Sequence, residues 1–292
     1  MFKRAVITDE ISQDMPRAIK VMKEYGMDGA ELRSVWGKPP HELDDEELRT
    51  IKWQLDRAGL EMPCIAAPVF KCRLYSQSDF ESHLAILEHC MDMSDLFGSK
   101  LIRGFTFWAE GTFDESVPEI VKKLRIAERA IAKRGKLLVI EYDPATSAGT
   151  TQKLEVILRQ VASEHIQALF DPGNNIYDAE GEAPFPDGYE RIRPWIRHVH
   201  VKDVKRRGKD GKPEAAIVGE GDVGFASLFE RLVKDGYRGW ASLETHYRRA
   251  AAISTELLHR PMGYSFSEGG EEASIDCLKA WDRILKERGL TS

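Results

Sequence analysis

The stretch PEIVKKLRIAERAIAKRGKLLVIEY, residues 118–142, contains the pattern that decides the fold of this chain. Its apolar residues first recur at three- and four-residue steps, which places them on one face of a helix: Ile120, Leu124, Ala127 and Ile131. Gly135 then ends the helical pattern, and the apolar run LLVIE that follows is typical of a strand covered on both faces. The stretch therefore predicts a helix, a tight turn and a buried strand, in that order.

This helix–glycine–strand unit recurs along the chain. Four further glycines stand between a helical pattern and a short strand: Gly26, Gly59, Gly98 and Gly236. Eight strands are predicted, over residues 5–8, 29–33, 62–66, 100–105, 137–142, 166–171, 197–202 and 240–244. Eight such units in 292 residues predict a single α/β domain over residues 1–292, a (β/α)8 or TIM barrel.

A doubly wound open sheet is the alternative fold for alternating strands and helices. That fold usually carries a glycine-rich first turn that binds a nucleotide. The first turn here is ITDEISQD, residues 7–14, and it contains no GxGxxG motif. The pattern therefore favours the barrel.

Composition and charge exclude several classes of protein. The chain has 42 Lys and Arg against 48 Asp and Glu, a net charge of −6, so a general electrostatic grip on nucleic acid is not expected. No apolar run approaches the roughly 20 residues that span a bilayer. The N-terminal segment does not match a signal peptide, and the four cysteines form no CxxC motif. We therefore expect a cytoplasmic protein without a nucleic-acid or membrane partner.

Polar residues stand where four consecutive predicted strands end: Glu141, Asp171, His200 and Glu244. Active sites of TIM barrels lie at the carboxyl ends of the strands, so these side chains are predicted to meet at one rim. Three carboxylates and an imidazole suit Mn²⁺ or Mg²⁺ better than a structural zinc ion. Each acid taken singly is more often a helix cap or a salt-bridge partner, but four such residues on adjacent strands indicate a metal site.

The predicted seventh strand carries two histidines on one face, because side chains of a strand alternate. His200 is nearer to the carboxyl end and is predicted as the ligand. His198 is predicted as a residue of the barrel interior or a hydrogen-bond donor to a ligand. Further candidates for substrate binding near the strand ends are Glu31, Trp36, Arg103, Trp108, Lys202, Arg206 and His246. For the aromatic residues, packing between barrel and helices is the alternative.

For each of three connecting segments the sequence supports two interpretations. Residues 202–213, KDVKRRGKDGKP, predict a solvated hairpin or loop, or a segment that places cations over an anionic substrate. Residues 217–223 predict a turn into the next helix, or backbone that closes over the pocket. Residues 248–271 predict an excursion that packs across the barrel mouth or against a partner subunit.

Six motifs spread over nearly the whole chain resemble those of a known family: GAELR (29–33), VIEY (139–142), FDPGNN (170–175), HVHVKD (198–203), VGEGDVGF (218–225) and SLETH (242–246). The family is the sugar phosphate isomerase/epimerase group of xylose isomerase-like TIM barrels. The resemblance implies one divalent ion, with Mn²⁺ favoured over Mg²⁺, Co²⁺ or Zn²⁺, held by Glu141, Asp171, His200 and Glu244. It also implies that Glu141 and Glu244 exchange a proton with the substrate, and that the chain forms a homo-oligomer.

Single positions refine this resemblance. Asn174 stands where the epimerases often carry a substrate-binding histidine, and Arg206 lies at the offset of an epimerase arginine, six residues beyond His200. The pair Lys202-Asp203 is typical of branches that include the inosose dehydratases. The endonucleases of the superfamily need further metal-binding histidines that this chain lacks, so DNA cleavage is not expected.

Proton abstraction next to a metal-polarised carbonyl supports three outcomes. Return of the proton gives an epimer or an aldose–ketose isomer, whereas loss of a β-hydroxyl gives a dehydrated product. We predict a metal-dependent isomerase or epimerase of a small sugar or keto-sugar. The alternatives are a lyase that dehydrates a keto-polyol, in the manner of inosose dehydratase, and a noncatalytic sugar-binding barrel, which needs no opposed carboxylates.

Overall fold

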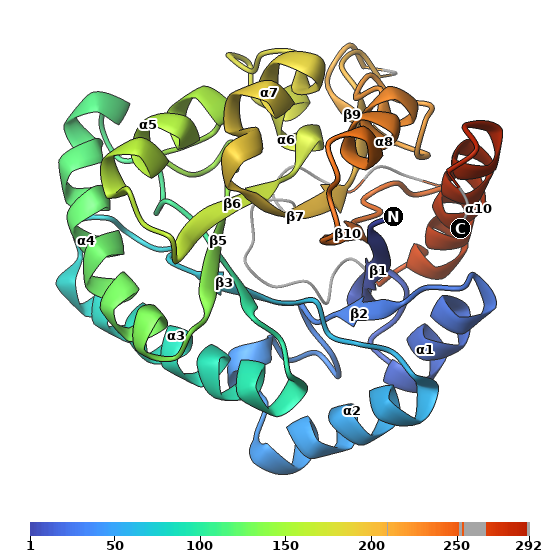
Figure 1. The fold of residues 1–292 in the computed structure, drawn as a ribbon, viewed down its shortest axis with the longest axis horizontal. Helices are drawn as coiled ribbons and strands as arrows, with labels where there is room; N and C mark the ends of the chain where they lie inside the picture. The colour runs from blue at the N-terminus through green and yellow to red at the C-terminus, as the bar shows by residue number, and fades with distance from the viewer. Residues whose placement is uncertain (209, 251–252, 254–266, 291–292) are drawn as a thin grey trace.

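Eight parallel strands form the centre of the chain in a computed structural model, which describes residues 1–208, 210–250, 253 and 267–290. Neighbouring strands follow the order β2-β1-β10-β7-β6-β5-β4-β3, and every pair in that order is parallel. The strands are β1 (Lys3–Ile7), β2 (Gly29–Glu31), β3 (Cys64–Val69), β4 (Leu101–Gly104), β5 (Leu137–Glu141), β6 (Ile166–Phe170), β7 (Ile196–Val201) and β10 (Trp240–Leu243). Figure 1 shows them arranged around a common centre.

The two edge strands of this sheet, β2 and β3, meet and close it. Isolated parallel bridges join Gly29 to Glu61 and Leu32 to Ile65. Within this seam the Ala30 N–H donates to the Glu61 carbonyl at 2.9 Å. The closure confirms the predicted TIM barrel and excludes the open sheet.

The predicted strands differ from the observed ones only near their ends. The largest difference is at β3, predicted over residues 62–66 and observed over Cys64–Val69. Its register against β4 shifts between Ile65 and Val69, an irregularity that lets the strand continue past Pro68 to the rim. An apolar pattern alone does not indicate such a bulge.

Helices form the outer layer of the barrel (Figure 1). They are α1 (Met15–Glu24), α2 (Asp45–Ala58), α3 (Gln77–Phe97), α4 (Phe113–Lys133), α5 (Thr151–Val161), α6 (Pro172–Tyr177), α7 (Tyr189–Ile192), α8 (Phe225–Lys234) and α10 (Gly270–Glu287), with single turns η1 (Thr8–Glu10), η2 (Pro40–Glu42), η3 (Pro184–Gly188) and η4 (Arg193–Trp195). Among the described residues, no helix combines the length and the apolar character needed to cross a bilayer.

The helices form where capping and apolar spacing agree. On α4 the four residues of the predicted face, Ile120, Leu124, Ala127 and Ile131, are fully buried. The α2 helix begins with a capping box, in which Asp44 accepts from the Glu47 N–H and Glu47 accepts from the Asp44 N–H, both at 2.9 Å. These apolar faces cover the outside of the barrel and leave its two ends open to loops.

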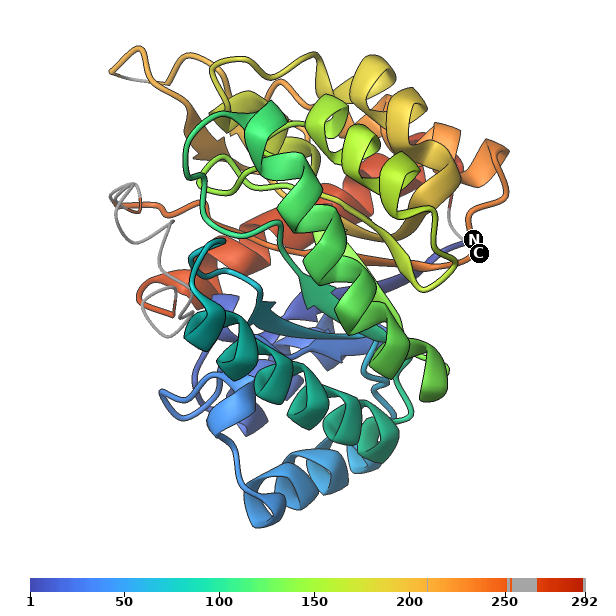
Figure 2. The ribbon, with the colours of Figure 1, turned by 90° about the vertical axis from the view of Figure 1, so that its left-hand side faces the viewer.

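The loops at the carboxyl ends of the strands carry the additional structure. After β7 the chain forms the predicted hairpin, in which β8 (Asp203–Lys205) pairs antiparallel with β9 (Glu214–Ala216). Figure 2 shows this hairpin and the chain's N-terminus on opposite sides of the barrel. The side that carries the hairpin is the side on which the candidate site residues lie.

The seam between β2 and β3 gives a test of barrel closure. An added Cβ at Gly29 would lie 2.7 Å from the Glu61 carbonyl oxygen and 2.6 Å from the Trp240 ring. We expect Gly29→Ala to lower the free energy of unfolding by about 1–3 kcal/mol, because backbone at the seam has to move. Urea denaturation measures the change.

Gly104→Ala is the matched control, because the added Cβ meets only the Leu138 side chain, at 2.8 Å, which can turn away. A smaller loss is expected there. Equal losses in the two variants would contradict the account of the seam.

Candidate metal centre and active site

The four predicted ligands meet at the carboxyl ends of the strands. Glu141 is the last residue of β5, Asp171 and Glu244 directly follow β6 and β10, and His200 lies near the end of β7. One ligand atom of each residue lies within 4.8 Å of those of the other three, and all four residues are buried. We call these four residues the rim cluster.

The donor atoms of the rim cluster fit a divalent cation. Three carboxylates and an imidazole are ligands that Mn²⁺ and similar cations accept. His200 Nδ1 is buried and makes no hydrogen bond within the described part of the chain. It lies 3.4 Å from Glu244 Oε2 and 3.9 Å from Glu141 Oε1. A buried nitrogen among carboxylates and without a hydrogen bond is what a metal ligand requires, so the cluster can hold such an ion.

A lysine ammonium lies inside the rim cluster. Lys202 Nζ is 2.5 Å from Asp171 Oδ2 and 3.0 Å from Glu244 Oε2, and it donates to Asn174 Oδ1 at 3.0 Å. Burial opposes its charge, but the surrounding carboxylates raise the pKa of Lys202 well above its usual value. The predicted substrate-binding residues Lys202 and Asn174 are thus in direct contact with the predicted ligands.

The pKa values of the two carboxylates nearest to the Lys202 ammonium are shifted in opposite directions. Burial raises the pKa of Asp171 well above its usual value, against the opposing charge of Lys202. Burial acts in the same direction on Glu244, but the charges of Lys202 and His246 outweigh it and hold the pKa of Glu244 well below its usual value. Carboxyl groups whose pKa values are pushed apart are typical of acid–base sites.

Glu141 is oriented from two sides. Arg103 donates to Glu141 Oε2 at 3.1 Å and to the Ala66 carbonyl at 2.7 Å, so the guanidinium is tied to β3. Asn174 donates to Glu141 Oε1 at 3.1 Å and to the Tyr142 carbonyl at 2.8 Å. The predicted substrate-binding residues Arg103 and Asn174 therefore contact a rim-cluster carboxylate, and a substrate would share them with Glu141.

Glu244 is surrounded by basic side chains. Arg33 donates to Glu244 Oε1 at 2.8 Å and to Glu10 Oε1 at 2.7 Å. His246 Nε2 lies 3.4 Å from both Glu244 Oε1 and Glu10 Oε1. Asp9 also pairs with Arg33, at 3.1 Å. The predicted residue His246 thus belongs to a buried network that holds Glu244 in place.

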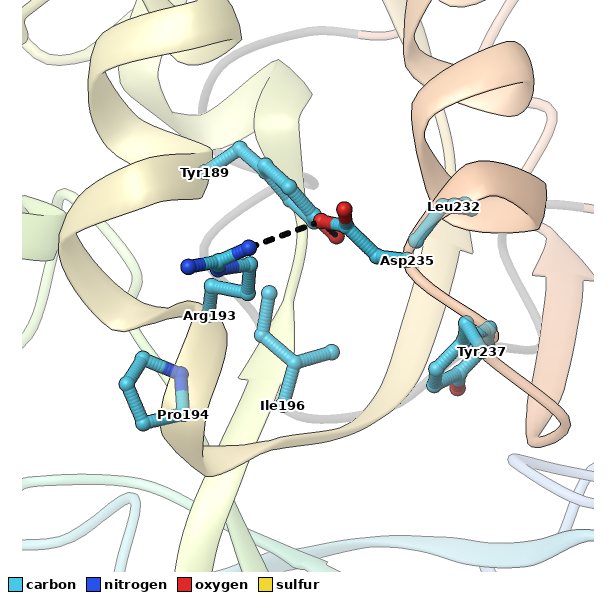
Figure 3. A pocket seen from close by; sticks show the side chains of 7 residues that line it. All are labelled: Tyr189, Arg193, Pro194, Ile196, Leu232, Asp235 and Tyr237. Carbon is cyan, nitrogen blue, oxygen red and sulfur yellow. Dashed lines mark hydrogen bonds and ion pairs between the residues drawn. The ribbon is translucent and has the colours of Figure 1, made fainter.

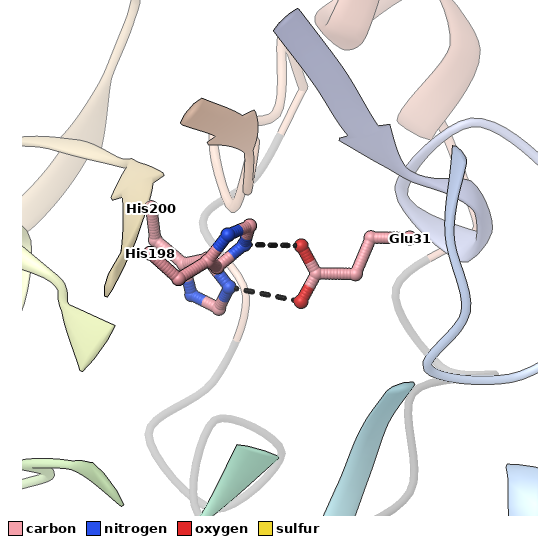
Figure 4. Close-up of side chains that lie close together, drawn as sticks. All are labelled: Glu31, His198 and His200. Atoms are coloured by element: carbon pink, nitrogen blue, oxygen red, sulfur yellow. Dashed lines mark hydrogen bonds and ion pairs between the residues drawn. The ribbon is translucent and has the colours of Figure 1, made fainter. Parts of the chain in front are cut away.

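Glu31 joins the two histidines of β7 in the barrel interior (Figure 4). Its carboxylate lies 2.7 Å from His198 Nε2 and 3.2 Å from His200 Nε2. All three side chains are fully buried. Glu31 was predicted to bind substrate from the rim, but the structure turns both of its oxygens toward the histidines. His198 occupies the predicted interior position and bonds to Glu31 rather than to a member of the rim cluster.

A comparison of sequences decides the family. The sequence profile of the xylose isomerase-like TIM barrels matches residues 19–281. The chain belongs to that family. The resemblance of its six motifs is thereby confirmed.

Individual members of the xylose isomerase-like family show what the chain is similar to. An inosose dehydratase of Lacticaseibacillus casei is 24% identical over 278 residues, covering 85% of this chain and 87% of that protein. An inosose dehydratase of Klebsiella pneumoniae is 28% identical over 164 residues, and in that match the chain spans about half of the relative, 52% of this chain against 54% of the other. A solved structure of D-allulose 3-epimerase from Methylomonas sp. matches with a TM-score of 0.71 at 17% identity, covering 98% of each chain.

The remaining predicted residues of this xylose isomerase-like barrel lie farther out. Trp36 is 39% exposed on the segment between β2 and α2. Trp108 follows β4, and the ammonium of Lys71 lies 5.5 Å from its ring. Arg206 is exposed beyond β8, where its backbone N–H donates to Asp222, so the structure does not bring its side chain into the rim cluster. The residues 251–252 and 254–266 of the predicted excursion lie outside the described residues.

Backbone strain concentrates at the same rim. Four residues beyond the strands adopt a left-handed φ although they are not glycine: Trp36, Phe70, Phe107 and His246. Such conformations cost of order 1–3 kcal/mol each and cluster at functional sites. They follow β2, β3, β4 and β10, so the strain surrounds the mouth above the rim cluster.

Hydrogen bonds to one carboxylate fix the loop of residues 217–223. The Asp203 carboxylate accepts from the backbone N–H groups of Gly219, Gly221 and Val223 at 2.7–3.3 Å. A Cβ at Gly221 would lie 2.2 Å from the same carboxylate, so only glycine fits there. The loop, predicted as a turn or a pocket cover, is tied to the residue that follows Lys202 and leads into α8.

One further pocket lies at the opposite, amino-terminal end of the barrel. Tyr189, Arg193, Asp235 and Tyr237 are among its lining residues. Figure 3 shows Tyr189 and Arg193 reaching Asp235, at 2.9 and 3.2 Å. Asp235 thus pairs with Tyr189 and Arg193, the Tyr237 hydroxyl donates to the Arg197 and Trp240 carbonyls, and the pocket is remote from the rim cluster. It therefore does not compete as the active site.

Sequence reasoning missed two acids that complete the network at Glu244. Asp9 and Glu10 directly follow β1 in the stretch ITDEISQD, and both are fully buried. The strand-end rule that found the rim cluster also applies to the first strand and would have identified them. Lys71 and Asp143, which pair at 2.9 Å beside the mouth, carry the same signal after β3 and β5.

Asp9 gives a pH test of this buried network. Burial raises the pKa of Asp9 from 3.8 to about 6, against the charge of Arg33. The folded state thus binds this proton more tightly than the unfolded state, and the stability it contributes is lost as the pH rises from about 4 through 6.

Asp9→Asn removes that titration. Relative to wild type, its free energy of unfolding should rise by about 2 kcal/mol between pH 4 and pH 7, since the shift is about two pKa units and the unfolded-state group is already half ionised near pH 4. Urea denaturation of both proteins across this range measures the difference, in which the titrations of groups remote from Asp9 cancel. A difference that does not change with pH would contradict the account.

Proposed function

We propose that this chain is a divalent-metal-dependent lyase that removes water from a small keto-polyol or keto-sugar. The observation that carries the proposal is the position of Lys202, whose ammonium touches Asp171 and Glu244 inside the rim cluster. Dehydration next to a carbonyl needs a base for the carbon-bound proton and an acid for the departing hydroxyl. The carboxylates of the rim cluster can supply the base, and the ammonium of Lys202 can supply the acid.

A metal ion at the rim cluster would make the carbon-bound proton easier to remove. Held by Glu141, Asp171, His200 and Glu244, it would polarise the substrate carbonyl and a neighbouring hydroxyl and stabilise the negative charge that develops there. The protein groups around the cluster then orient the substrate and move the protons.

The two glutamates have unequal surroundings, which separates their roles. Glu244 contacts Arg33 and Lys202, and these cations keep it ionised. Glu141 contacts one cation, Arg103, and the neutral amide of Asn174. A carboxylate held ionised by several cations is a poor proton carrier. We therefore assign Glu141 as the base that takes the proton α to the carbonyl.

Lys202 is the acid of the proposed reaction, since a divalent ion held by Asp171 and Glu244 would offset the carboxylate charges that raise the pKa of Lys202. As the carbon–oxygen bond of the β-hydroxyl breaks, the electron pair leaves with oxygen and the ammonium supplies a proton, so that one water molecule is released. Asn174 connects the two groups, because it donates to Glu141 Oε1 and accepts from Lys202 Nζ. A single amide thus fixes the distance between base and acid.

The relatives support this direction of the reaction. Matches that cover most of this chain, including that from Lacticaseibacillus casei, bear the name inosose dehydratase. An inosose is a small cyclic polyol with one carbonyl, which provides the acidic carbon-bound proton and the β-hydroxyl that the mechanism needs. We propose this class of uncharged keto-polyol as the substrate.

An isomerase or epimerase is the second candidate. Glu141 and Glu244 stand on β5 and β10, which are separated in the barrel by β6 and β7, and both belong to the rim cluster. Two carboxylates that reach one site from separated strands can take and return a proton. The roles then require a protonated Glu244 during turnover, which its cationic surroundings oppose.

Product analysis in deuterated water tests the proposal. The full chain loaded with Mn²⁺ is incubated with a panel of inososes and ketoses, and products are identified by mass spectrometry. We expect loss of one water molecule from an inosose and an ultraviolet-absorbing enone or dione. A product that has lost no water and is heavier only by the deuterium at its α-carbon would replace the lyase by an epimerase or isomerase.

Variants separate the two proton transfers. Lys202→Met should lower water loss by roughly 10²–10⁴-fold and leave α-deuterium exchange in place, whereas Glu141→Gln should abolish both. Lys205→Met is the matched control, because Lys205 is exposed on the β8–β9 hairpin. Wild-type turnover in Glu141→Gln would overturn both the lyase and the epimerase.

A further inference from the structure

His200 has two ring nitrogens, and the structure shows which one faces the rim cluster. Nε2 lies 3.2 Å from Glu31 Oε1, while Nδ1 lies 3.4 Å from Glu244 Oε2. An ionised carboxylate only accepts hydrogen bonds, so Nε2 carries the hydrogen toward Glu31. When His200 is neutral, the lone pair on Nδ1 is then directed at the rim cluster and is available to a cation.

Glu31 cannot turn away from this position, because a second imidazole holds its other oxygen. His198 Nε2 lies 2.7 Å from Glu31 Oε2, and the two rings stand nearly perpendicular, at 83°, with their centroids 5.4 Å apart. Figure 4 shows both rings directed at the one carboxylate. Rotation of the carboxylate would break one of the two hydrogen bonds.

The contact crosses the barrel interior rather than following the sheet. Glu31 ends β2 and the histidines lie on β7, and β1 and β10 separate these strands. None of the three side chains is exposed. Water therefore does not compete for these hydrogen bonds, and a buried carboxylate whose oxygens both accept from imidazole is energetically satisfied.

We propose that Glu31 and His198 are positioning residues that hold His200 with Nδ1 toward the rim cluster and thereby set the affinity of that cluster for a divalent ion. The inference rests on the metal site of the proposed function and adds to it two residues that do not touch the ion. Glu31 orients the ring of the ligand, and His198 orients Glu31. Partners of this kind typically change metal affinity by 10–100-fold when they are removed.

Glu31→Gln tests the role of the carboxylate. An amide of the same shape offers one oxygen and one N–H₂ group, so it cannot accept from both rings. Calorimetric titration of the full chain with Mn²⁺ should give an affinity 10–100-fold below that of wild type. Glu61→Gln is the matched control, since Glu61 is an exposed acid that pairs with Lys3 outside the barrel.

A spectroscopic readout distinguishes positioning from a general effect on the fold. In wild type with ¹⁵N-labelled histidine, addition of Mg²⁺ should shift the Nδ1 resonance of His200 and leave Nε2 protonated. In Glu31→Gln the ring should populate both tautomers before the ion is added. His198→Gln should show the same change to a smaller extent, because Glu31 loses one of its two anchors.

Each outcome decides the inference. Wild-type Mn²⁺ affinity in Glu31→Gln, or a His200 ring that responds through Nε2, would overturn the positioning role while the proposed function stands. Absence of Mn²⁺ binding in wild type itself would overturn the metal site of the proposed function, and the inference with it. If Glu31→Gln does not fold, Glu31→Asp keeps the charge but is one methylene too short to reach both rings, and the same loss of affinity is expected.

Discussion

The burial of several carboxylates around one point is the constraint on which the rest of this structure depends. An ionised acid loses several kcal/mol of hydration when it is buried, and it stays ionised only if cations or hydrogen-bond donors replace the water. Glu141, Asp171 and Glu244 are each within reach of a basic side chain, namely Arg103, Lys202 and, for Glu244, Arg33 as well. The strands of the barrel and the residues that follow them therefore supply both the acidic and the basic side chains of the site.

These ion pairs make the two sides of the site electrostatically unequal. Positive groups gather on the side of Glu244 and leave Glu141 with one guanidinium and one amide. The same arrangement that makes burial tolerable thus makes the two glutamates chemically different. A reaction that uses one base and one acid fits such a site better than one that passes a proton between equivalent groups.

Much of the fold and the rim cluster could be predicted from the sequence, because both follow from local patterns of apolar and polar residues. The apolar run before Glu141 marks a buried strand, and the barrel geometry then fixes the end at which that acid lies. The hydrogen bonds could not be predicted. Arg33 and Glu244 are 211 residues apart, and their contact depends on how β2 and β10 are placed in the closed sheet.

The direction in which a side chain points is the second feature that could not be predicted from the sequence. Glu31 stands at a strand end in the motif GAELR, and the strand-end rule predicts that it faces the mouth. Its side chain instead points into the interior, where His198 and His200 each contact one of its two oxygens. A short strand of three residues does not reveal from its sequence which residues turn inward. Arg206 is the opposite case. Its offset from His200 predicts a position at the rim, but the β8–β9 hairpin carries Arg206 away from the rim cluster, where it is exposed.

The metal content of the purified protein tests the central claim most directly. Wild type and His200→Ala are loaded with Mn²⁺, freed of loosely bound ions and subjected to elemental analysis. We expect about one ion per chain in wild type and its loss in the variant, since the imidazole is the only nitrogen ligand of the four. Absence of metal from wild type after loading with Mn²⁺, Mg²⁺, Co²⁺ and Zn²⁺ in turn would contradict it, and the buried carboxylates would then serve the fold or the substrate alone.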